Sequence, residues 1–238
     1  MSAHEIVPGL YQIPLGIVHA WIIDDGELML VDTGVPGSAD RITAFVERLG
    51  RPVTDITRII ATHAHYDHTG SLAQMQRRSG ATVFMHPEDA QLLAAGESMR
   101  PVTPGKGILN SVLNTFFGGA GATPVEAVRE VQPLVDGQVL PHSGGIEVIH
   151  VPGHCAGQVC LFLREKNTLI AADLMSHIAG LSEPLVFEDR ALGLESVFRV
   201  SRREFSVACF GHGRPIRSGA VSAIRAWIGR HPDMGRFR

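Results

Sequence analysis

The sequence predicts an α/β fold in which two mixed β-sheets pack face to face, with helices outside. Short apolar, β-branched runs alternate with stretches of helical periodicity along its 238 residues. The two halves share one plan, in which meandering strands are followed by strand–helix units, so each half can supply one sheet and its helices. Hydrophobic residues make up 45% and charged residues 19%, which suits a substantial core. We expect a single domain over residues 1–238.

The individual elements follow from apolar runs and from the residues that end them. Asp24-Asp25-Gly26 forms the turn of a hairpin, Gly50 can cap a helix, and Pro87 suits the first position of another. Before residue 96, we expect strands over 10–13, 17–23, 28–31, 56–61 and 81–85, and helices over 39–49, 71–78 and 87–95. After residue 126, we expect strands over 131–135, 138–140, 146–151, 159–163, 168–172 and 207–210, and helices over 190–205 and 220–228.

The segment 96–126 is expected to be an insertion rather than a second domain, because its periodicity fades while glycine and proline become frequent. It contains an apolar series at near-helical spacing that includes Leu109, Val112, Phe116 and Phe117. Three interpretations stay open for this series. It forms a hydrophobic lid over a site, a contact in a homodimer, or ordinary core.

Composition and charge exclude several classes of protein. The net charge of -3, with no basic stripe, gives no footprint for nucleic acid. No apolar stretch is long enough to span a membrane, and the N-terminus lacks the pattern of a signal peptide. The three cysteines lack the spacing of a metal knuckle and are expected to be reduced thiols. We therefore expect a cytoplasmic protein that does not associate with membranes.

Seven potential metal ligands lie at the ends of predicted strands. Three histidines and one aspartate fall within six consecutive residues after the strand over 56–61, and two histidines and one aspartate follow later strands. A loop held at both ends by rigid elements can bring such side chains to one point. In chain order the seven are His63, His65, Asp67, His68, His154, Asp173 and His212.

This pattern resembles the ligand set of the metallo-β-lactamase superfamily, which is H-x-H-x-D-H followed by a distant His, Asp and His. The settings Asp32-Thr33-Gly34, Gly153-His154 and Gly211-His212-Gly213 match as well, and the resemblance covers nearly the whole chain. It implies an αββα four-layer sandwich of the metallo-β-lactamase type with a two-metal site along one edge. By position, one ion would be held by His63, His65 and His154, the other by Asp67, His68 and His212, and Asp173 would bridge them.

The residue types in this set indicate the ions and the reaction. Imidazoles and carboxylates suit two divalent ions, with zinc expected and iron or manganese as alternatives. Such a pair can generate a shared hydroxide that attacks a carbonyl carbon, so hydrolysis is the leading class. Asp67 is expected both to bind metal and to orient the nucleophile or accept its proton. Asp32 either orients a ligand or stabilises its own turn. His177, four residues after Asp173, either reaches the site as a catalytic residue or faces solvent.

The expected substrate is a small molecule, an acyl-bearing or otherwise apolar ester, lactone or thioester. Only about one helix follows Gly213, which weakens similarity to glyoxalase II enzymes. The stretch after Asp173 lacks the tyrosine usual in quorum-quenching lactonases, unless His177 replaces it. Asp173 stands where the commonest zinc β-lactamases carry cysteine, so β-lactam hydrolysis ranks lower. Phosphodiester hydrolysis also ranks lower, because nucleases of the superfamily add an RNA-binding arm or an extra domain and neither is visible in this sequence. The alternative from another class is a mononuclear iron dioxygenase or another redox member of the fold.

Overall fold

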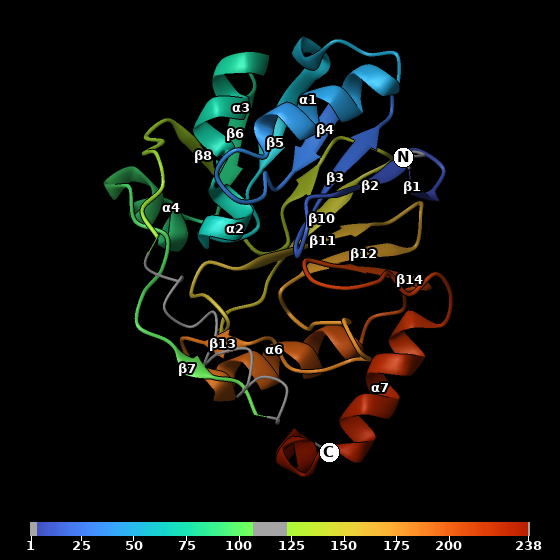
Figure 1. Cartoon of the computed structure of the whole chain (residues 1–238). Helices are drawn as coiled ribbons and strands as arrows, with labels where there is room; N and C mark the ends of the chain where they lie inside the picture. The colour runs from blue at the N-terminus through green and yellow to red at the C-terminus, as the bar shows by residue number, and fades with distance from the viewer. Residues whose placement is uncertain (1–3, 107–122, 238) are drawn as a thin grey trace. The chain divides into compact units, whose positions relative to one another are not determined.

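The computed structural model describes residues 4–106 and 123–237, and contacts along the chain divide it into two compact units (Figure 1). Unit 1 comprises Met1–Met99 and Ala120–Val135, and unit 2 comprises Arg100–Gly119 and Asp136–Arg238. The expectation of a single domain stays a prediction. The apolar series at Leu109, Val112, Phe116 and Phe117 lies outside the described residues.

Unit 1 is built on a seven-stranded mixed sheet. The strands β1 to β4 pair antiparallel, whereas β4, β5, β6 and β8 pair parallel, so the carboxyl ends of these last four lie at one edge. In sheet order the strands are β1 (His4–Val7), β2 (Leu10–Pro14), β3 (His19–Asp24), β4 (Leu28–Val31), β5 (Ile56–Ile60), β6 (Thr82–Met85) and β8 (Val131–Pro133).

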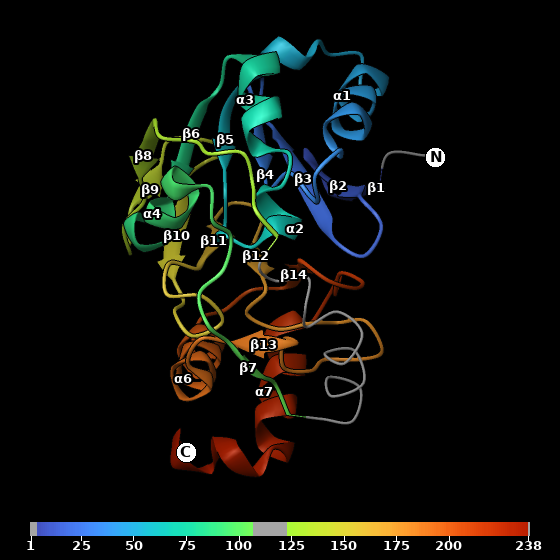
Figure 2. The ribbon, with the colours of Figure 1, turned by 60° about the vertical axis from the view of Figure 1, so that its left-hand side comes forward.

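Helices α1 (Ala39–Arg48) and α3 (Leu72–Ser79) lie on one face of this sheet (Figure 2). Ala20 and Ile22 of β3 share a hydrophobic core with Ile42 of α1. Trp21, which alternates with these two residues, points to the opposite face and is also fully buried. Both faces of the sheet are therefore buried, as in layered α/β folds. The helices of unit 1 are α1 (Ala39–Arg48), α2 (Tyr66–Thr69), α3 (Leu72–Ser79) and α4 (Pro87–Ala95), with a 3-10 turn at Val53–Asp55.

Unit 2 repeats the plan with a five-stranded mixed sheet. Leu194 of α6 and Trp227 of α7 share a core with Ile149 and Leu169 of the sheet. In sheet order the strands are β14 (Val207–Phe210), β12 (Thr168–Ala172), β11 (Val159–Leu163), β10 (Ile146–His150) and β9 (Val139–Leu140). Among the described residues of this unit, the helices are α6 (Arg190–Ser201) and α7 (Ala220–Arg230), followed by a 3-10 helix at Pro232–Phe237. A small ribbon pairs β7 (Thr103–Pro104) with β13 (Val186–Phe187).

The expected elements are present, and the differences have identifiable causes. The helix expected over 190–205 ends at Ser201, because Phe205 turns into the core and its carbonyl accepts a hydrogen bond from Val221 N at 3.4 Å. Four short elements were not predicted from the sequence. They are two to four residues long: β1, β7, β13 and α2. Elements this short carry little periodic signal. No helix in the described part of the chain has the length and apolarity needed to cross a membrane.

Candidate metal centre

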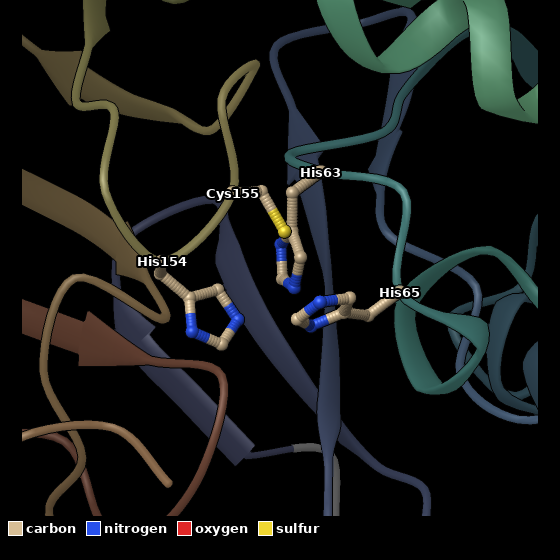
Figure 3. Close-up of side chains that lie close together, drawn as sticks. All are labelled: His63, His65, His154 and Cys155. Carbon is tan, nitrogen blue, oxygen red and sulfur yellow. The ribbon is translucent and has the colours of Figure 1, made fainter. Parts of the chain in front are cut away.

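The four clustered candidate ligands of unit 1 lie together after β5. The ring centroids of His63 and His65 are 4.8 Å apart with their planes at 78° (Figure 3), and those of His63 and His68 are 4.0 Å apart. Asp67 Oδ2 lies 4.0 Å from His68 Nε2. His63, His65 and His68 are buried. Because α2 begins directly after His65, the turn of the helix brings Asp67 and His68 back toward the two histidines of the loop.

A buried carboxylate, that of Asp32, organises this loop from the end of β4. Its Oδ1 accepts a hydrogen bond from Thr62 N at 2.8 Å, and its Oδ2 accepts one from the Thr62 hydroxyl at 2.9 Å. His68 Nδ1 lies 2.8 Å from the same Oδ2. Asp32 has a φ of +60°, a left-handed conformation that aspartate tolerates better than most residues. Both carboxylate oxygens are therefore engaged by the segment that carries the histidines.

These hydrogen bonds determine which nitrogen of each histidine is the donor. The Thr62 hydroxyl hydrogen goes to Asp32, so the Thr62 oxygen accepts from His63 Nδ1 at 3.0 Å. His68 Nδ1 donates to the Asp32 carboxylate. With Nδ1 protonated, the lone pair of each ring is on Nε2, the arrangement found in metal-ligating histidines that are oriented by a carboxylate.

We expect Asp32→Ala to weaken zinc binding by about 10–100-fold, the usual effect of removing a group that orients a metal ligand. The cause is loss of the acceptor that holds His68 directly and His63 through Thr62. Competition with a chromophoric chelator measures the affinity. Asp25→Ala, at an exposed hairpin turn, is the matched control and should bind zinc as the wild type does. Wild-type affinity in a folded Asp32→Ala protein would contradict this role.

Two further residues of unit 1 support the loop and were not found from the sequence. Asp89 of α4 is fully buried, and its Oδ2 accepts a hydrogen bond from Ala64 N at 3.0 Å. Thr33 donates to the carbonyl of His68 through both its amide, at 2.7 Å, and its hydroxyl, at 2.9 Å. In the sequence, Asp89 resembles an ordinary acidic residue in the first turn of a helix, so its contact with Ala64 has no local signal.

The three candidate ligands of unit 2 lie at one edge of its sheet. The strands β10, β12 and β14 run in the same direction, because β10 and β12 both pair antiparallel with β11 and because β14 pairs parallel with β12. His154, Asp173 and His212 follow the carboxyl ends of these strands. Asp173 Oδ2 lies 3.6 Å from His154 Nε2 and 3.2 Å from His212 Nε2. Unit 2 thus brings together all three of its predicted ligands.

His154 is oriented in the same manner as the histidines of unit 1. It lies on the loop after β10, together with Cys155 (Figure 3). Its Nδ1 donates to the Val186 carbonyl at 2.8 Å, which again leaves the lone pair on Nε2. Gly153 has a φ of +133°, and it allows the loop to approach the backbone of Gly193 in α6.

His177 lies beside His212 in unit 2. Its amide donates to the His212 carbonyl at 2.9 Å, and its Nδ1 donates to the Arg214 carbonyl at 2.7 Å. Gly213 permits this pairing, because a Cβ there would lie 2.1 Å from the His177 backbone. The catalytic role of His177 stays a prediction.

Two buried cysteines do not supply thiolate ligands. Burial raises the pKa of the Cys209 thiol to about 12 and raises the pKa of the Cys160 thiol well above its usual range. Cys160 Sγ donates to the Ala171 carbonyl at 3.3 Å. Both groups therefore stay protonated at neutral pH.

The donor sets of the two units fit a divalent metal. Each set combines imidazoles with a carboxylate, and in each an anchored Nδ1 leaves Nε2 as the ligand nitrogen. Nitrogen and oxygen donors of this kind suit zinc and neighbouring divalent ions. A chain with two mixed sheets, helices on each and such donors at strand ends has the features of a metalloprotein of the α/β class.

The comparison with protein families identifies this class more closely. The family model for the Metallo-beta-lactamase superfamily matches residues 13–212, and the chain belongs to this superfamily. The match includes all seven candidate ligands. A solved structure of a metallo-beta-lactamase family protein from Thermus thermophilus is 23% identical and covers 94% of this chain and 79% of that one, with a TM-score of 0.71. The predicted fold class, an αββα sandwich of the metallo-β-lactamase type, is confirmed.

Relatives of known sequence differ in how much of their length is matched. In Bacillus subtilis (strain 168), the uncharacterized protein YobT is 30% identical over 170 residues, which are 69% of this chain and 65% of YobT. The protein named "Probable metallo-hydrolase YflN", from the same strain, is 23% identical over 90% of this chain and 88% of its own. The human acyl-coenzyme A thioesterase MBLAC2 is 33% identical over 119 residues, which are 49% of this chain and 40% of that protein. The chain thus spans slightly less than two thirds of YobT and under half of MBLAC2.

Proposed function

We propose that this chain is a two-metal hydrolase acting on the carbonyl of an ester, lactone or thioester. The main support for the proposal is the tautomer that three histidines share. The Nδ1 atoms of His63, His68 and His154 all donate to protein acceptors. With Nδ1 acting as the donor, Nε2 of each ring is the nitrogen that would bind a metal, as in metal-ligating histidines oriented by a second group. The seven candidate ligands would hold the two ions, and Asp173 is the residue proposed to be shared by both.

Side chains of the protein would supply the proton transfer and the positioning that the proposed hydrolysis needs. When bound, divalent ions lower the pKa of a coordinated water and polarise a carbonyl oxygen. Of the two candidate carboxylate ligands, Asp67 is the more exposed, with 13% of its side chain accessible against 7% for Asp173, so it is the one proposed to exchange a proton with solvent. Asp32 and Asp89 keep the loop after β5 in place, so the donors need little reorganisation. His177 is proposed as a further catalytic residue next to His212.

A thioester is the first substrate to test. The human relative MBLAC2 is named an acyl-coenzyme A thioesterase, and the metallo-hydrolase name of YflN supports the broader reaction class. A thioester, an oxygen ester and a lactone all present a carbonyl carbon to an attacking oxygen, so one site can serve the three. The substrate is proposed to be a small acyl-bearing or apolar molecule. Zinc is the proposed ion, and one iron per chain with oxygen consumption would instead indicate the dioxygenase alternative.

We expect the zinc-loaded protein to hydrolyse acyl thioesters or lactones faster than β-lactams or phosphodiesters, and to contain two metal ions per chain. Release of free thiol from acyl-coenzyme A, with a chromogenic thiol reagent, measures the thioesterase reaction. Because Cys160 and Cys209 are buried with raised pKa values, they should contribute little background. Chelator-treated protein is the control, and zinc should restore its activity. Two bound ions without hydrolysis of any carbonyl substrate would refute the proposal.

A further inference from the structure

Two segments of unit 2 that are far apart in the sequence pair with each other through hydrogen bonds. The strand β7 pairs antiparallel with β13, with Thr103 opposite Phe187. The Thr103 hydroxyl donates to the Phe187 carbonyl at 3.2 Å, and Gly105 N donates to the Leu185 carbonyl at 2.8 Å. The chain just after Arg100 is therefore held to the segment that precedes α6.

The same segment before α6 holds the loop of His154. Val186 accepts from His154 Nδ1 at 2.8 Å, and Glu188 N donates to the His154 carbonyl at 3.1 Å. Asp189 N donates to the Gly153 carbonyl at 2.9 Å, and the Asp189 side chain caps α6 by accepting from Leu192 N at 3.0 Å. Both the ring and the backbone of His154 are thus positioned by residues 186–189.

The side chain of Glu188 joins these two sets of contacts. Its Oε2 accepts a hydrogen bond from Ala156 N at 2.9 Å, two residues beyond His154. Its Oε1 lies 3.2 Å from Arg100 Nη1. Only 12% of the Glu188 side chain and 27% of the Arg100 side chain are exposed. Glu188 therefore forms hydrogen bonds with both ends of the turn at His154. Its amide donates to the His154 carbonyl, and its carboxylate accepts from Ala156 N.

We propose that Glu188 is a positioning residue for His154 and that Arg100 holds the Glu188 carboxylate in place. The inference rests on the proposed function in one respect, that His154 is a metal ligand. Partial burial distinguishes this ion pair from a pair on the surface, where solvent screens the charges and the contribution is small. Arg77 and Glu126 in unit 1 form such a surface pair, with 60% and 59% of their side chains exposed and their closest atoms 2.5 Å apart.

The test compares Glu188→Ala, Glu188→Gln and Arg100→Met with Glu126→Gln, the matched control at the surface pair. We expect Glu188→Ala to bind zinc about 10–100-fold more weakly, with a changed visible spectrum of the cobalt-loaded protein. Glu188→Gln keeps an oxygen that can accept from Ala156 N, so it should restore most of the affinity. Arg100→Met should show an intermediate loss, and Glu126→Gln should match the wild type in both measurements.

A second measurement on the metal-free protein separates this inference from the proposed function. Hydrogen exchange at Ala156 N should become about tenfold faster in Glu188→Ala, because the acceptor of this amide is removed. It should become about threefold faster in Arg100→Met, because the Glu188 carboxylate loses its ion-pair partner. If the wild type binds no divalent metal, the proposed function fails while amide exchange still decides the role of Glu188. If Glu188→Ala does not fold, Arg100→Met decides it. Unchanged exchange at Ala156 in the folded variants overturns the inference.

Discussion

Asp173→Ala should lose bound metal and hydrolytic activity together, with kcat/KM falling about a thousandfold, since Lewis-acid stabilisation is worth several kcal/mol and each 1.36 kcal/mol is a tenfold change. The Asp173 side chain is 7% exposed, and its Oδ2 lies within 3.6 Å of Nε2 of both His154 and His212. Without it, unit 2 would offer only the two imidazoles, with no negative charge to help hold either ion. Metal content by elemental analysis and the steady-state rate with an acyl thioester are the two measurements.

Two other variants make the Asp173 result specific. Asp173→Asn preserves the shape of the side chain but removes its charge, so it should retain more metal than Asp173→Ala and still hydrolyse slowly. Glu195→Ala removes an exposed carboxylate of α6 in the same unit and should leave metal content and rate unchanged. Full activity of Asp173→Ala with two ions bound would exclude Asp173 as the bridging ligand.

Gly153→Ala should lower the free energy of unfolding by about 3 kcal/mol or more, because overpacking against backbone is added to an unfavourable φ. A Cβ at this position would lie 2.1 Å from Gly193 N and 2.2 Å from Gly193 Cα. These are backbone atoms, so α6 or the loop of His154 must move. The midpoint of thermal unfolding should fall by about 10 °C for a chain of this length. Zinc affinity should fall as well, because His154 follows directly.

A matched glycine separates the steric effect from the effect of backbone conformation. Gly180 has a φ of +125°, close to the +133° of Gly153, but no atom lies within 4 Å of a Cβ built on it. Gly180→Ala should therefore cost only about 1 kcal/mol, the usual effect of an unfavourable φ. Equal losses of stability in the two variants would mean that the close approach to α6 contributes nothing. Calorimetry or thermal circular dichroism measures both.

The fold class and the candidate ligands could both be predicted from the amino-acid sequence. Its apolar runs located the strands, and strands that run in one direction bring their carboxyl ends to the same edge of a sheet. Residues with chelating side chains directly after such strands must then lie near each other within each unit, as His154, Asp173 and His212 do in unit 2. The sequence also singled out Asp32, although it left open whether that residue orients a ligand or its own turn. The hydrogen bond to His68 supports the first interpretation.

Which groups orient the candidate ligands depends instead on how distant segments of the chain pack together. Asp89 accepts a hydrogen bond from Ala64 N, 25 positions earlier in the sequence. The Val186 carbonyl accepts one from His154 Nδ1, 32 positions earlier. Glu188 and Arg100 come from segments joined by the two-residue strands β7 and β13. A ligand's position after a strand is a local property that periodicity reveals. The partner of its second nitrogen is chosen by which distant backbone or carboxylate packs against it, and no local pattern encodes that choice.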